Sequence, residues 1–143
     1  MLFRSQALLA RLKKALAAAG ARASTVAARL AGVSAADGQH CPADMALAGA
    51  PACLFDAVVV LGSPQGIAAL ARQPAALDWA RDAWRHLKTI GHDVAGHGLL
   101  QAAGVGSDAA VIVLSNKASV DALLATAAQG KHLAREGAPG TDA

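Results

Sequence analysis

Aromatic residues are scarce in this chain of 143 residues, and tyrosine is absent altogether. The aromatic residues are Phe3, Phe55, Trp79 and Trp84. Proteins that hold single-stranded nucleic acid stack its bases on aromatic side chains that lie in a basic groove. The basic residues of this chain have no interleaved aromatic residues, so the sequence predicts no nucleic-acid partner.

Long hydrophobic runs are also missing. The uncharged stretch from Ala57 to Ala71 is interrupted by Gly62, Pro64 and Gly66. It is also shorter than the roughly 20 residues that a membrane-spanning helix needs. We therefore expect no membrane segment.

Acidic residues are absent before Asp37, although six lysines and arginines precede it. Such a basic segment could meet phosphates, an acidic partner or a membrane surface, but the simplest interpretation is the solvated face of one helix. Arg11, Lys13 and Lys14 would lie inside the apolar stretch of a secretory signal, which argues against one. Organelle transit peptides share the acid-poor pattern, but the segment also fits an integral helix, and we expect a cytoplasmic protein.

Cysteine occurs twice, as Cys41 and Cys53. Without an export signal, reduced thiols are the expected state. His40 precedes Cys41, and a histidine beside a cysteine can activate its thiolate. Side chains of adjacent residues rarely point at each other, however, so we interpret both cysteines as ordinary thiols.

Apolar residues are plentiful, at 55% of the sequence against 16% charged residues, which favours a folded domain. Helical spacing and capping residues predict helices over residues 5–19, from Pro74 to about Leu87, from about Gly96 to Ala103, and from Ser115 or Asn116 to about Arg135. Strands are predicted over Ser24–Leu30, Leu54–Leu61, Thr89–Asp93 and Ala110–Leu114. Residues 32–51 fit an irregular or hairpin excursion, and residues 62–66 (GSPQG) fit a loop.

The segment Leu54–Leu61 is the strongest strand candidate. Its apolar run shows no alternation, which is typical of a parallel strand covered on both faces. Strands and helices alternate along the rest of the chain. The sequence therefore predicts an α/β fold of three layers, an open parallel sheet with helices on both faces.

Five segments carry a family resemblance. They are Ala36–Gly38 with Ala43, Asp44 and Leu47, then Phe55–Val60 (FDAVVV), Ala83–Ile90 (AWRHLKTI), Leu99–Val105 (LLQAAGV) and, more weakly, Lys131–Glu136 (KHLARE). In this order and spacing they resemble the C-terminal domain appended to large-subunit haem catalases. That domain is flavodoxin-like and is related to PfpI-type peptidases and class I glutamine amidotransferases.

The resemblance implies one domain over residues 1–136, followed by a disordered tail over residues 137–143. Members of the family open with an apolar strand, whereas this chain begins almost directly in a helix, so we expect the first strand to be missing. Its absence would expose strand edges at Ser24–Leu30 and Leu54–Leu61. Exposed edges pair readily with other chains, so we expect self-association or binding to a catalase core or tetramer.

The active enzymes of that superfamily place a cysteine on the sharp turn after a strand, near a helix N-terminus that lowers its pKa. The matching turn here is Asp93-Val94, and neither serine nor cysteine occurs between Pro64 and Gly106. A PfpI-like hydrolase or amidotransferase is therefore a disfavoured alternative. We assign no catalytic residue.

Three residues, His92, Asp93 and His97, form an HD-x₃-H pattern, with His86 as the nearest candidate for a third histidine ligand of zinc. The pattern straddles a strand end and a helix start. We interpret these residues as ordinary polar residues of the sheet rim, and His86 as a histidine that interacts with a helix C-terminus. We assign no metal ligand.

The loop at 62–66 could offer backbone N–H groups to an anion. It lacks the GxGxxG and Walker patterns, so a small anion or nucleotide binder is a further alternative, with no cofactor-binding residue assigned.

The favoured hypothesis is a non-catalytic structural or assembly module. The resemblance implies a parent enzyme that dismutates hydrogen peroxide in the oxidative stress response, with haem in a separate domain. Catalases ligate haem iron through tyrosine, which this chain lacks. We therefore expect no cofactor in this chain and no enzymatic activity of the chain alone.

Overall fold

The computed structural model describes residues 2–21, 26–27, 33–34, 40–41, 45–46 and 55–136. The helices are α1 (Leu2–Ala18), α2 (Pro64–Leu70), α3 (Pro74–Arg85), α4 (His97–Ala102) and α5 (Lys117–Ala128), with a 3-10 turn, η3 (Leu133–Arg135). The strands are β1 (Val26–Ala27), β2 (Val33–Ser34), β3 (His40–Cys41), β4 (Met45–Ala46), β5 (Ala57–Val60), β6 (Thr89–His92) and β7 (Val111–Val113).

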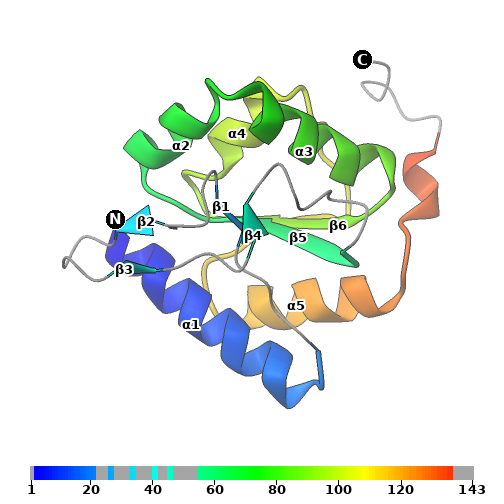
Figure 1. The fold of residues 1–143 in the computed structure, drawn as a ribbon. Coiled ribbons are helices and arrows are strands. Elements are labelled where there is room, and N and C mark those ends of the chain that lie inside the picture. Colours follow the sequence, from blue (N-terminus) through cyan, green and yellow to red (C-terminus); the bar gives the residue numbers. More distant parts are fainter. Residues whose placement is uncertain are drawn as a thin grey trace.

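A parallel sheet of three strands, in the order β5-β6-β7, forms the middle of the molecule. Its register aligns Val58 with Ile90, and Ile90 with Val111. Helices α2, α3 and α4 cover one face of the sheet, and α1 and α5 cover the other (Figure 1). The predicted three-layer α/β fold is confirmed.

The core beneath α2, α3 and α4 is built largely from small residues. Three alanines on the buried face of α3 leave room for the one large side chain there, that of Trp84. The buried members of this core are Val58, Val60, Ile67, Ala76, Ala80, Ala83, Trp84, Ile90, Leu99, Leu100 and Ala103. The alanine-rich composition thus forms a thin but continuous layer, because small residues bring helix and sheet close together.

The second core lies between the sheet and the pair α1 and α5, which pack against each other. Its buried residues are Leu8, Leu12, Leu114, Val120 and Leu123. On the other side of α1, Arg11, Lys13 and Lys14 are exposed. For these three residues the interpretation as a solvated helix face is confirmed, whereas the side chains of Arg4, Arg22 and Arg29 lie outside the described part.

Residues 62–66 are not the loop that the sequence predicted. Helix α2 begins at Pro64, because Ser63 caps it by accepting a hydrogen bond from the N–H of Gly66 at 3.0 Å. Proline suits this first helical position, where its missing N–H has no partner to lose. The prediction overlooked the helix because it placed the next helix start at Pro74.

The prediction that the final helix runs to Arg135 is also wrong. Helix α5 starts with the predicted cap, Asn116, whose side chain accepts from the N–H of Ser119 at 2.9 Å. It ends at Ala128, and Gly130 adopts a φ of 82°, a left-handed conformation that glycine tolerates without strain. The chain then turns towards the end of α3.

The predicted hairpin excursion is represented by β2 and β3, which pair antiparallel, with Val33 opposite Cys41. Strand β1 pairs in parallel with β4 and covers two residues of the predicted strand Ser24–Leu30. The rest of that range, Cys53 and the predicted tail over 137–143 lie outside the described residues.

Within the described part of the chain, β5 pairs with β6 on one side and with no strand on the other. Among the same residues, none of the helices has both the length and the apolar character needed to cross a bilayer.

Candidate functional site

The turn after β6 is the position at which the sequence resemblance would place a nucleophile. Asp93 is buried here, and its carboxylate accepts hydrogen bonds from the N–H groups of Gly96 at 2.6 Å and Gly62 at 3.2 Å. Its own N–H donates to the carbonyl oxygen of Val60 at 3.2 Å. Asp93 therefore ties the turn to the end of β5, and both carboxylate oxygens serve the backbone.

Gly96 makes this close approach possible. A Cβ atom at this position would collide with the carbonyl oxygen of Val60 and would lie 3.0 Å from Oδ1 of Asp93. Glycine is needed wherever two backbone segments come this close. The turn is thus shaped by packing between β5 and β6.

Val94 occupies the exposed point of the turn, with 81% of its surface accessible. A nucleophile elbow is a strained turn, but among the described non-glycine residues it is Leu87, and not Val94, that has a positive φ. An aliphatic side chain can neither attack a carbonyl nor transfer a proton. The side chain at the exposed tip of this turn is therefore not a nucleophile.

The sequence pattern HD-x₃-H brings two histidines together. The ring centres of His92 and His97 lie 5.2 Å apart, and Nδ1 of His92 is 2.8 Å from the carbonyl oxygen of Asp93. His86 caps the C-terminal end of α3, before β6 begins, and so does not join them. In the described part of the chain, no group of three or more His, Cys, Asp or Glu side chains gathers around a metal position.

The candidate anion loop uses its N–H groups internally. Gly62 donates to Asp93, Gly66 donates to the Ser63 hydroxyl, and Ile67 donates to the carbonyl oxygen of Ser63. These three donors are therefore committed to the turn and to the cap of α2.

The candidate pair His40 and Cys41 forms β3, where their side chains lie outside the described part, as does the whole of Cys53.

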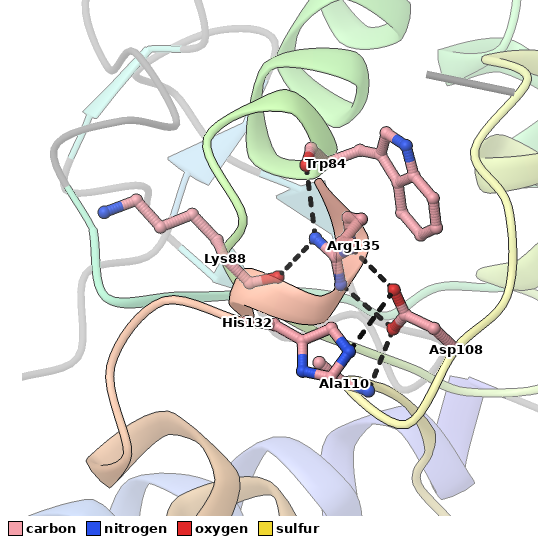
Figure 2. Close-up of polar contacts among 6 residues, drawn as sticks. All are labelled: Trp84, Lys88, Asp108, Ala110, His132 and Arg135. Atoms are coloured by element: carbon pink, nitrogen blue, oxygen red, sulfur yellow. Dashed lines mark hydrogen bonds and ion pairs between the residues drawn. The ribbon is translucent and has the colours of Figure 1, made fainter. Parts of the chain in front are cut away.

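A second polar cluster surrounds Arg135, between the end of α3 and the segment that precedes β7 (Figure 2). The Arg135 guanidinium is buried and donates from Nε to Oδ2 of Asp108 at 2.7 Å and from Nη2 to Oδ1 at 3.1 Å. Its Nη1 donates to the carbonyl oxygens of Trp84 at 3.2 Å and Lys88 at 2.9 Å. Every nitrogen of the guanidinium thus has a partner.

The cluster closes the C-terminal end of α3. Cζ of Arg135 lies 4.1 Å from the centre of the Trp84 ring, a cation–π contact. The N–H of His132 donates to the carbonyl oxygen of Leu87 at 2.8 Å. Carbonyl groups at a helix end have no partner within the helix, and here the residues after α5 supply it.

Asp108 is the acidic partner in this cluster. Burial by itself raises the pKa of the Asp108 carboxyl. The hydrogen bonds from Arg135 and from the N–H of Ala110, together with the charges of Arg135 and His132, lower the pKa by more than burial raises it, so it lies below its ordinary value. Asp108 is therefore ionised over the whole physiological range of pH.

Sequence reasoning did not single out this cluster. The one available signal was the KHLARE segment of the family resemblance, which contains His132 and Arg135. Nothing local pointed to Asp108, because the partner of a buried arginine is chosen by the fold.

Comparison with known proteins places this geometry in a family. The model of the C-terminal domain found in long catalases matches residues 4–136. The chain belongs to that family. Catalase C of Rhizobium meliloti (strain 1021) is 37% identical over 101 residues, which are 69% of this chain and 14% of that catalase. The match therefore covers a small part of the relative's length.

The turn at Asp93–Gly96 and the Arg135 cluster both lie within the residues that match the family. This catalase C-terminal domain thus carries a valine at the exposed tip of the turn after β6. The predicted family is confirmed, and with it a catalase-associated module.

Proposed function

We propose that this catalase C-terminal domain is a non-catalytic structural and assembly module. The observation that carries the proposal is the turn after β6, where Val94 stands at the nucleophile position and Asp93 is bound to the backbone of Gly62 and Gly96. A hydrolase or amidotransferase of the PfpI type would need a reactive group there. Instead of a reactive group, the turn contains a carboxylate that stabilises the local backbone.

Haem chemistry would belong to a separate domain of a parent catalase. Catalases bind haem iron through tyrosine, and this chain has none. Dismutation of hydrogen peroxide, as part of an oxidative stress response in the cytoplasm, would then be an activity of the whole enzyme. We propose no cofactor of that reaction in this chain.

Strand edges support an assembly role. Within the described residues, β5 and β7 are the two edges of the central sheet, and Val113 on β7 is 52% exposed. Edge strands present unpaired N–H and C=O groups that can pair with another chain. The partner would be a second copy of the domain or the haem-binding core of a catalase.

The catalytic half of the proposal is tested on the purified chain of 143 residues. Titration with haem should produce no stoichiometric Soret band, and addition of hydrogen peroxide should release no oxygen above the buffer rate. Esterase and amidase substrates should likewise stay intact. A stoichiometric haem complex that evolves oxygen would contradict the proposal.

The assembly half is tested by sedimentation velocity at several concentrations, alone and with the haem core of a long catalase that lacks its C-terminal domain. We expect either a concentration-dependent dimer or a complex that sediments with the core. A chain that stays monomeric throughout and leaves the core unchanged would rule out this role. The alternative of an anion or nucleotide binder predicts a rise in melting temperature with phosphate or ATP, which we do not expect.

A further inference from the structure

The two histidines at the turn after β6 have a spacing that matches a shared ligand. Their ring centres are 5.2 Å apart, with an angle of 33° between the ring planes. Zinc–nitrogen bonds of about 2.05 Å, ring nitrogens about 1.15 Å from the ring centre and a tetrahedral angle of about 109° together put two such centres roughly 5.2 Å apart. Two rings that merely stack also have centres about 4.5–7 Å apart. The distance alone therefore does not distinguish a shared metal ion from ring stacking.

A second observation is the hydrogen bond of the buried ring. Nδ1 of His92 lies 2.8 Å from the carbonyl oxygen of Asp93. Because a carbonyl oxygen only accepts, Nδ1 carries the hydrogen, and Nε2 of the neutral ring keeps its lone pair. Metal-binding histidines commonly donate their other N–H to a backbone carbonyl, which fixes the tautomer and the ring orientation.

The pair is also reachable from solvent. His92 is 4% exposed, whereas His97 is exposed at the first position of α4. In the described residues, the fully buried polar side-chain atoms that lack a hydrogen-bond partner are Trp84 Nε1 and Thr89 Oγ1. Nε2 of His92 is not one of them, so this nitrogen is not fully buried without a partner. One imidazole is thus held by a hydrogen bond inside the turn, and the other lies beside it at the surface.

The two oxygens of Asp93 accept from Gly96 and Gly62, and in the described residues no third His, Cys, Asp or Glu side chain joins the two imidazoles in a metal-binding group. A metal held by the two imidazoles would keep its remaining positions for water or for an anionic ligand. Imidazole nitrogen suits zinc, copper and nickel, whereas hard cations such as magnesium prefer oxygen ligands.

We propose that His92 and His97 form an open binding site for a divalent transition-metal ion, with zinc as the reference ion. The proposal departs from the sequence interpretation of these two residues as ordinary polar residues of the sheet rim. It adds a ligand-binding property to a turn that has no nucleophile, and it does not depend on the assembly role.

The test is calorimetric titration of the full chain with Zn²⁺ after alkylation of the cysteines, which removes thiol ligands. We expect one Zn²⁺ per chain. His97→Ala should weaken the affinity by about tenfold or more, the scale on which metal sites respond to lost contacts. His86→Ala is the matched control, because it also removes an exposed histidine, and it should leave the affinity unchanged.

A second readout avoids substitution of the buried ring, which could unfold the turn. Two-bond ¹H–¹⁵N spectra of the histidine rings should show that Zn²⁺ shifts the Nε2 signal of His92 together with the ring signals of His97. Unchanged affinity in His97→Ala, shifts confined to other histidines, or no binding to the wild-type chain would each overturn the proposal.

Discussion

Arg135 and Asp108 lie 27 residues apart in the sequence and meet through two parallel hydrogen bonds, of 2.7 Å from Nε and 3.1 Å from Nη2. The planar guanidinium fork matches the two oxygens of a carboxylate, which makes such pairs directional as well as strong. Since Arg135 also binds the carbonyl oxygens of Trp84 and Lys88, one side chain joins the residues after α5 to the end of α3 and to the segment before β7.

Removal of this side chain should destabilise the domain severely. Arg135→Ala leaves the partly buried Asp108 without its main partner and removes the buried guanidinium donors to the carbonyl oxygens of Trp84 and Lys88, which should lower the free energy of unfolding by about 3–5 kcal/mol. Urea denaturation followed by tryptophan fluorescence measures this. Arg72→Ala, at an exposed arginine, is the control and should change it by less than about 0.5 kcal/mol. Equal losses in the two variants would show that the Arg135 cluster adds little.

The same pair makes stability depend on pH. The pKa of Asp108 is lower in the folded state than its ordinary value of about 3.9. Its contribution is therefore complete above that value and is lost as the pH falls through the folded-state pKa. The difference in unfolding free energy between the wild type and Asp108→Asn should be constant from pH 7 to about pH 5 and shrink below about pH 4. Urea titrations at a series of pH values measure it, and a difference that persists undiminished at pH 2 would contradict this origin.

The turn after β6 should tolerate no side chain at Gly96. Gly96→Ala drives a Cβ atom into the carbonyl oxygen of Val60, and we expect a loss of about 2 kcal/mol or more, because backbone on both sides must shift. Gly98→Ala is the matched control in α4, where the new Cβ atom would lie 3.4 Å from Ile67, an ordinary contact. Thermal unfolding compares the two. Similar melting temperatures would mean that β5 and the turn can separate without cost.

Leu87 has a φ of 62°, a left-handed conformation at the end of α3 that favours glycine. The N–H of Leu87 donates to the carbonyl oxygen of Trp84, and the N–H of Lys88 donates to the carbonyl oxygen of Ala83. These two hydrogen bonds end the helix. Leu87→Gly and Leu87→Ala remove the same half-buried side chain beyond Cβ, but only the glycine variant relieves the strain. The glycine variant should therefore be more stable than the alanine variant by about 1 kcal/mol in urea unfolding. The opposite order would show that the surrounding contacts impose no strain.

Much of the fold could be predicted because its signals are local. The apolar run at Leu54–Leu61 predicted β5, and the cap at Asn116 predicted the start of α5. At the end of α5 the prediction failed because it overlooked Gly130, which has a left-handed conformation just after the helix. The residues after Ala128 follow a path that ends on Asp108 and on the carbonyl groups of α3, and no helical spacing reports that path.

Some features of the candidate site could likewise be predicted from the sequence, and others could not. The absence of serine and cysteine near Asp93 and Val94 could be read directly from the sequence. The hydrogen bonds that the Asp93 carboxylate accepts could not be predicted from the sequence, because they depend on how closely the end of β5 approaches the turn. The orientation of His92 towards His97 likewise follows from that approach and from the hydrogen bond to the Asp93 carbonyl oxygen.

By itself, the sequence determined the class of fold, since periodicity, capping and residue type act within a few positions along the chain. The order and spacing of the segments that resemble catalase C-terminal domains indicated the family, and the sequence shows directly that no serine or cysteine lies near Asp93. Only the tertiary structure decided that Arg135 is buried against Asp108, that Gly96 approaches the backbone of Val60, and that the rings of His92 and His97 lie 5.2 Å apart. These relationships join segments far apart in the chain or depend on how closely such segments pack. Whether a charge is paired, a Cβ atom fits or two rings meet is settled by that packing, which the local pattern does not encode.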